Sequence, residues 1–160
     1  MSISNILAIY NLSSAAEIRA GLDWYAVAHN EALSISERHN IPLTTVIGVI
    51  AALSPNNKWQ RNLDNADALI AAYLDGETVE SVKVSTYHTM KAKAWSILAD
   101  QLDETDDILT RLNGQKIKSF YECILGVAHG ICIDGHALNI WRNERHGLTS
   151  DKTNIGKRLY

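Results

Sequence analysis

The part of the chain with the clearest chemical potential is a short basic stretch that follows an Asn-Gly pair. Gly114 permits a positive φ and a close approach of the backbone. The amides at the start of the next expected helix point outward, where they could hold one phosphate. Lys116 and Lys118 add positive charge beside them. Asp134 stands where the N-cap of a later helix is expected, so its carboxylate should lie near the same end of the domain.

The distribution of charge agrees with a local phosphate contact. The net charge of −3 argues against a general binder of polyanions. However, residues 1–110 have a net charge of −7 and residues 111–160 have one of +4. A basic C-terminal segment on an acidic body is what such a contact needs. The same asymmetry is also common in proteins that bind no phosphate.

The hydrophobic pattern predicts helices along the chain, beginning with a long one. Ser14 and Glu17 have the spacing of a capping box, and Asn40-Ile-Pro42 should end the helix. Its apolar face should include Ile18, Leu22, Tyr25 and Leu33. Leu43 to Leu53 is apolar all round, and because no partner strand is evident we expect a central buried helix that ends at Pro55.

Six further helices are expected, over residues 59–73, 86–101, 105–112, 116–129 and 135–141 and from about Ser150 or Asp151. In the helix over residues 86–101, Met90, Ala94 and Ile97 should face the core, whereas Lys91 and Lys93 should face solvent. The tryptophans on these helices are expected in the core: Trp59, Trp95 and Trp141.

The length of 160 residues suits one hydrophobic core, so we expect a single domain over 1–160. The N-terminus has no basic residue before its apolar stretch, which argues against a secretory signal. The longest apolar run, around Val46 to Leu53, is too short to cross a bilayer, so we expect a cytoplasmic location and no membrane. Cys123 and Cys132 are too few for a zinc or iron–sulfur site. They should be buried thiols, and neither metal nor cofactor is expected.

The basic stretch belongs to a longer window, Leu112 to Lys118, an apolar helix, and then Ile131-Cys-Ile-Asp-Gly-His136. This window resembles the helix-hairpin-helix (HhH-GPD) DNA glycosylases, the group that includes endonuclease III. Their signature is Leu-Pro-Gly-Val-Gly-x-Lys, a helix, and an Asp followed closely by His and Arg. The resemblance aligns Lys118 with the lysine nucleophile and Asp134 with the catalytic aspartate. It also aligns His136 with the following histidine and Arg142 near the arginine.

Two further segments are similar to the same family. Val49 to Asn57 is similar to a Leu-Leu-Ser-x-Gln segment, with Asn56 on a glutamine that wedges into the duplex. Met90 to Leu98 is similar to a Lys-Ala-x-x-Ile helix. The three segments occur in the order of the family. Two residues of the hairpin depart from its pattern, because Asn113 replaces proline and Lys116 replaces the second glycine.

The resemblance implies an all-α, two-lobed helical fold of the DNA glycosylase type, with the helix-hairpin-helix unit at about 105–130. It implies an enzyme that acts on a flipped-out base of DNA, most simply an N-glycosylase with or without lyase activity. Asp134 would stabilise an oxocarbenium-like state, and Lys118 would attack the sugar carbon and form a Schiff base. Asn56 or Asn57 would fill the gap left by the base. Further DNA contacts are expected from Gly114, Lys116, His136 and Arg142.

Two other functions stay open. Some phage-encoded relatives of this superfamily are thought to modify bases rather than remove them. Alternatively, the chain is a non-catalytic DNA-binding or regulatory module, or it binds a protein through its N-terminal helices. In that case Lys118 is a phosphate contact or a solvated lysine, Asp134 is only an N-cap, His136 is structural, and Asn56 and Asn57 are ordinary turn residues.

Overall fold

The computed structural model describes residues 3–127 and 130–147, and every regular element in these two ranges is helical. The order is α1 (Ile3–Leu12), α2 (Ala15–His39), α3 (Leu43–Leu53), α4 (Trp59–Leu74), the 3-10 helix η1 (Val79–Ser81), α5 (His88–Ala99), α6 (Thr105–Arg111), α7 (Gln115–Leu125) and α8 (Gly135–Arg142). The all-α class predicted from the hydrophobic period is therefore confirmed for this part of the chain. The helix expected from about Ser150 or Asp151 lies outside the described residues.

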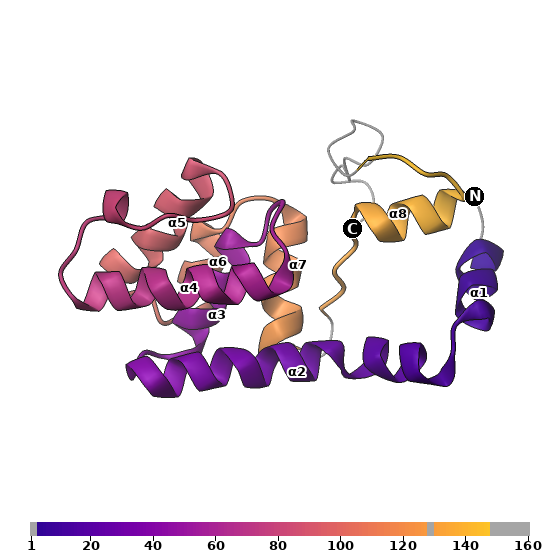
Figure 1. The fold of residues 1–160 in the computed structure, drawn as a ribbon, viewed down its shortest axis with the longest axis horizontal. Coiled ribbons are helices and arrows are strands. Elements are labelled where there is room, and N and C mark those ends of the chain that lie inside the picture. The colour runs from indigo at the N-terminus through magenta and orange to yellow at the C-terminus, as the bar shows by residue number, and fades with distance from the viewer. Residues whose placement is uncertain (1–2, 128–129, 148–160) are drawn as a thin grey trace.

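Helix α3 is the centre of the fold, as its uniformly apolar sequence predicts. Every residue from Thr45 to Leu53 is buried, and α2, α4, α5, α6 and α7 pack around it (Figure 1). Helices α3 to α7 and the second half of α2 make up what we call the main body. Gly48 allows α3 and α6 to pack closely against each other, because a Cβ atom at this position would lie 2.8 Å from Ile108 Cγ2 of α6.

Helix α2 is long enough, about 37 Å at 1.5 Å per residue, to reach beyond the main body. It begins at the predicted capping box, in which Glu17 N donates to Ser14 Oγ and Ser14 N donates to Glu17 Oε2. It ends at Asn40, which adopts the left-handed conformation. The prediction that Leu22 lies on a buried face is wrong, because Leu22 is 72% exposed. The buried face begins only at Ala28, where the main body begins to cover the helix.

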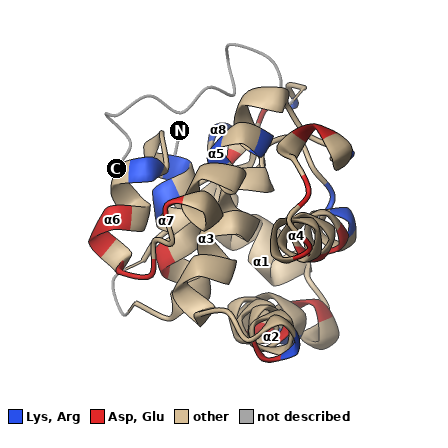
Figure 2. Ribbon diagram, turned by 90° about the vertical axis from the view of Figure 1, so that its left-hand side faces the viewer, with Lys and Arg blue, Asp and Glu red and all other residues tan. Residues whose placement is uncertain are grey.

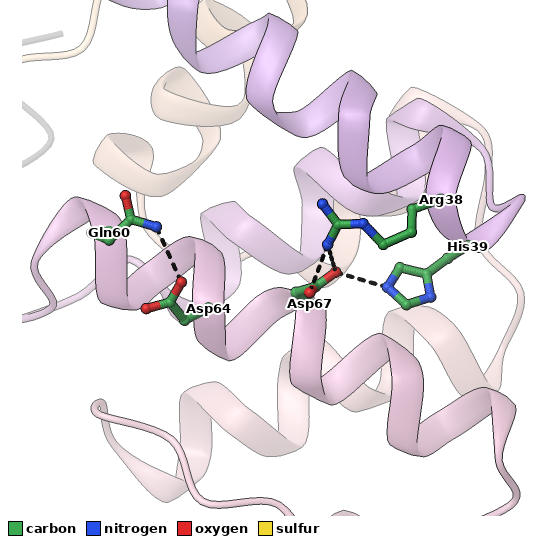
Figure 3. Close-up of polar contacts among 5 residues, drawn as sticks. All are labelled: Arg38, His39, Gln60, Asp64 and Asp67. Carbon is green, nitrogen blue, oxygen red and sulfur yellow. Dashed lines mark hydrogen bonds and ion pairs between the residues drawn. The ribbon is translucent and has the colours of Figure 1, made fainter.

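A cluster of charged side chains fixes α4 on the end of α2 (Figure 3). Asp67 of α4 accepts hydrogen bonds from Arg38 Nη1 and from His39 Nε2, each at 2.7 Å. Gln60 Nε2 donates to Asp64 Oδ1 one turn along the same helix. The contacts of Asp67 join α4 to the end of α2, whereas the bond between Gln60 and Asp64 lies within α4.

Helices α1 and α8 lie side by side at the other end of α2 (Figure 1). Asn5 Nδ2 of α1 donates to the backbone oxygen of Trp141 in α8 at 2.9 Å. The fold thus brings the start of the chain against a segment near residue 140. We call this unit the α1–α8 pair.

Two predictions about α5 and α7 need correction. Lys91 of α5 does not face solvent: it is buried and its Nζ donates to the backbone oxygen of Val82 at 2.9 Å. The carbonyl lies in the loop that covers α5, and the long side chain reaches it from within the fold. Helix α7 ends at Leu125, earlier than expected, because Gly126 adopts a left-handed conformation with φ of 86°. Over residues 3–127 and 130–147, no helix is both long and apolar enough to cross a membrane.

Candidate functional site

A cleft opens where the main body meets the segment that leads into α8. It has a volume of about 740 Å³. Its lining comes from α2, α4, α7, the start of α8 and the turn between α3 and α4. The polar lining consists of Ser54, Asn57, Asn62, Lys116, Cys132 and Asp134, and the remainder of Gly21, Trp24, Tyr25, Trp59, Phe120 and Ala137. The lining residues are spread along the sequence from Gly21 to Ala137. The cleft therefore forms only when distant segments pack together.

Three aromatic rings form one wall of the cleft. The ring centroid of Trp24 lies 5.0 Å from that of Trp59 and 5.9 Å from that of Phe120. Trp59 Nε1 donates to Glu31 Oε2 of α2 at 2.8 Å, which fixes this indole in place. Trp59 was expected in the core, and it packs partly against the core while it also lines the cleft. Such rings offer flat π faces to a planar heterocycle.

Asp134 is the N-cap residue of α8. Its Oδ1 accepts a hydrogen bond from the backbone amide of Ala137 at 2.8 Å. The predicted capping role is therefore confirmed. The same residue lines the cleft, so the cap also orients a carboxylate toward a space that could hold a ligand.

Helices α6 and α7 are joined by only three residues, and the turn depends on Gly114, whose φ is 85°. Lys116, in the first turn of α7, lines the cleft together with Phe120 one turn later. Lys118 does not appear in the lining. Two residues along an α-helix turn the side chain by about 200°, so Lys118 lies on the other side of α7 from Lys116. The cleft therefore brings Lys116 together with Asp134.

Charges of opposite sign lie next to each other around the connection between α6 and α7. The first turn of α6 carries Asp106 and Asp107, and basic residues follow at its end and at the start of α7 (Figure 2). Gly114 and Lys116 are exposed and Lys118 is half-buried.

Tyr25 and the two cysteines form a polar group in the wall of the cleft. Burial raises the pKa of Cys132 to about 11, although its hydrogen bond with Tyr25 and the charge of Lys116 act in the opposite direction. Burial likewise raises the pKa of the Cys123 thiol and that of the Tyr25 hydroxyl. Both cysteines are free. Cys123 is buried as predicted, whereas Cys132, also expected to be buried, is only half-buried because it lies in the lining of the cleft. With raised pKa values, these thiols are poor nucleophiles near neutral pH.

The two asparagines after Ser54-Pro55 differ in position. Asn56 is exposed and has a left-handed backbone with φ of 54°, whereas Asn57 lines the cleft. Asn62 also lines the cleft and was not identified from the sequence. The available signal was a polar residue next to Leu63 on the buried side of α4, which is unusual without a specific partner.

The other residues singled out from the sequence lie outside the lining. His136 is exposed in the first turn of α8, and Arg142 is half-buried in its last turn. Within the described ranges, no group of three or more His, Cys, Asp or Glu side chains is placed to hold a metal ion.

The described residues thus form an all-helical fold with a cleft lined by both aromatic and polar side chains. The chain belongs to the family of unknown function DUF7178, whose pattern matches residues 1–160. No curated protein and no solved structure matches the chain.

Proposed function

We propose that this protein processes a base of DNA that is flipped out of the duplex into the cleft, with cleavage of the N-glycosidic bond as the reaction. The observation that carries the proposal is that a carboxylate and an amine, Asp134 and Lys116, line a cleft that also has an aromatic wall. The resemblance to helix-hairpin-helix DNA glycosylases supports it. The α6–α7 connection, its positive-φ glycine and the following N-cap aspartate occur in the order of that family.

In the proposed reaction the base stacks against Trp24, Trp59 or Phe120, and the bond between the base nitrogen and the sugar C1′ breaks. The base leaves with the bonding electrons and takes up a proton. The positive charge that develops on the sugar is stabilised by the Asp134 carboxylate. A water molecule then adds to C1′ and loses a proton, which completes hydrolysis.

The lyase variant replaces water with the side-chain amine of Lys116. The amine forms a bond to C1′ and loses a proton, and opening of the sugar ring leaves a Schiff base. Lys118 was the lysine expected from the resemblance. We assign Lys116 to the nucleophilic role because it lines the cleft, and Lys118 to a contact with a backbone phosphate, together with the exposed turn at Gly114.

The gap that the base leaves in the duplex is proposed to be filled by Asn56. This residue is exposed at the tip of the α3–α4 turn, next to Asn57 of the cleft. Insertion of a side chain into the stack offsets part of the cost of base flipping.

Trapping with borohydride tests the lyase variant. The protein is incubated with a duplex that contains an abasic site, and borohydride reduces any imine to a stable amine. A covalent adduct is expected that Lys116→Ala abolishes and Lys118→Ala retains. An adduct that survives Lys116→Ala rejects the assignment of Lys116. If no adduct forms, the lyase step is rejected.

Excision assays test hydrolysis independently of the lyase step. Duplexes that each contain one modified base are incubated with the native chain and with Asp134→Asn, and free base is measured by mass spectrometry. Release of a base that depends on Asp134 supports the proposal. Binding to DNA without release by either protein supports instead a non-catalytic module, in which Asp134 serves only as the cap of α8.

A further inference from the structure

Two side-chain amides in the cleft each have an oxygen with no partner. Asn62 is 1% exposed. Its Nδ2 donates to the backbone oxygen of Ile50 at 2.9 Å, but its Oδ1 accepts no hydrogen bond. Asn57 Nδ2 donates to the backbone oxygen of Leu53 at 3.3 Å, and its Oδ1 is also buried and unpaired. A buried polar atom without a partner is destabilising, so two in one cleft call for an explanation.

The orientation of both amides follows from the end of α3. The backbone oxygens of Ile50 and Leu53 belong to the last turn of this helix and need donors. Reversing either side-chain amide would set oxygen against oxygen. The nitrogen of Asn62 is therefore committed to α3, and that of Asn57 to α3 and to Asn65 Oδ1 at 3.4 Å. Their oxygens are left as acceptors for another donor.

The rest of the lining does not supply the missing donors. The hydroxyl of Ser54 donates to the backbone oxygen of Ala51 at 2.8 Å. The indole nitrogen of Trp59 donates to Glu31. Asp134 is a further acceptor. Lys116 and Tyr25 of the lining carry further donors, but no described group donates to Oδ1 of Asn57 or of Asn62. A ligand that enters the cleft can supply the missing donors.

We infer that Asn57 and Asn62 recognise an amino group, so that the cleft selects an amino-bearing heterocycle of the adenine or cytosine type over its oxo counterpart. An exocyclic amino group carries two N–H donors, whereas an oxo group at the same position is an acceptor and meets the asparagine oxygens unfavourably. Both oxygens are shielded from solvent, so the side chains that cover them must move aside for a ligand to reach them, while the two amide nitrogens keep their bonds to α3. The inference rests on the proposed function only for the origin of the base in DNA.

Binding of nucleosides to the full chain tests this selectivity. Adenosine is compared with inosine and cytidine with uridine, because each pair differs mainly by an amino group and an oxo group. Titration calorimetry should give a dissociation constant at least about tenfold lower for the amino member of one pair or both, since an unpaired buried acceptor is costly. Equal affinities within both pairs, or a preference for the oxo members, overturn the inference.

Variants tie the selectivity to the two amides. Asn62→Leu and Asn57→Leu should each reduce the amino preference severalfold. Because Asn57 is only half-buried, Asn57→Leu keeps the test open if Asn62→Leu does not fold. Asn139→Leu is the matched control, because Asn139 also has a buried unpaired Oδ1 and donates to His146 O, but it does not line the cleft. A loss of preference in Asn139→Leu equal to that in Asn62→Leu assigns the effect to stability and overturns the inference.

The outcomes separate this inference from the proposed function. If amino nucleosides are preferred in an Asn62-dependent manner but no duplex releases a base, the recognition stands and glycosidic cleavage fails. If bases are excised while the affinities within each nucleoside pair are equal, cleavage stands and the recognition fails.

Discussion

The thiol of Cys132 donates to the backbone oxygen of Lys116 across 3.6 Å, and this contact joins the first turn of α7 to the segment that leads into α8. Lys116 and Asp134 line the cleft on the two sides of this junction. The thiol therefore helps to set the relative position of the amine and the carboxylate on which the proposed chemistry depends.

We predict that Cys132 reacts slowly with alkylating agents. Its pKa is raised to about 11 from an ordinary value of 9.0, mainly by burial, and only the thiolate reacts. Alkylation by iodoacetamide at pH 8 should be about 100-fold slower than for a free thiol, and it should rise about tenfold per pH unit toward pH 11. Mass spectrometry of the chain over a pH series measures this. Rapid alkylation at pH 7 would contradict the raised pKa of the thiol.

The same pKa predicts how stability changes at high pH. The folded state holds the thiol proton more tightly than the unfolded state. The contribution of Cys132 to stability is therefore complete below pH 9 and is lost between pH 9 and pH 11. Thermal unfolding of the native chain and of Cys132→Ser over this range should converge as the pH rises. Parallel curves for the two proteins would reject this linkage.

A third prediction concerns the packing of α3 against α6. Gly48→Val should destabilise the fold by about 1–3 kcal/mol, because the new Cβ would lie 2.8 Å from Ile108 Cγ2. Shortening the neighbour in Gly48→Val/Ile108→Ala should recover part of the loss. Gly21→Ala in α2 is the control, since its Cβ would have nothing within 4 Å and alanine favours a helix by about 1 kcal/mol. Urea unfolding should give opposite signs for Gly48→Val and Gly21→Ala.

The features of the fold that could be predicted from the sequence are those with local causes. The capping box at Ser14 and Glu17, the end of α2 at Asn40 and the cap at Asp134 each depend on residues within one helical turn. The buried position of α3 also follows from its own composition. In these cases the interactions that determine the structure are made within the segment itself.

The features that could not be predicted depend on long-range packing. Lys91 is buried because a loop carbonyl lies within its reach, and Leu22 is exposed because α2 extends past the main body. The choice between Lys116 and Lys118 depends on which side of α7 faces the cleft. A window of sequence contains both lysines but does not fix this rotation. Asn62 was missed because its importance lies in an unpaired oxygen, which only the packed structure reveals.

The double role of Asp134 gives a fourth prediction, in which capping and catalysis are separated. Asparagine is also a good N-cap, so Asp134→Asn should change stability by less than about 0.5 kcal/mol while it removes the negative charge. Excision should fall by about 10²- to 10³-fold, as it does when one group that stabilises a transition state is removed. Asp134→Ala should lose both the activity and about 1 kcal/mol of stability. Activity in Asp134→Asn close to that of the native chain would mean that the residue is only a cap.

The aromatic wall gives the last prediction. Trp24 is 36% exposed and stands at the edge of the cleft beside Trp59 and Phe120. A base that stacks there should quench tryptophan fluorescence, and Trp24→Ala should weaken binding of nucleosides by about 5- to 150-fold, the range that corresponds to about 1–3 kcal/mol per stacked base. Trp95→Phe is the control, because Trp95 packs edge to face on Tyr73 in another part of the main body. If Trp24→Ala binds nucleosides as tightly as Trp95→Phe does, the ligand does not stack on this wall.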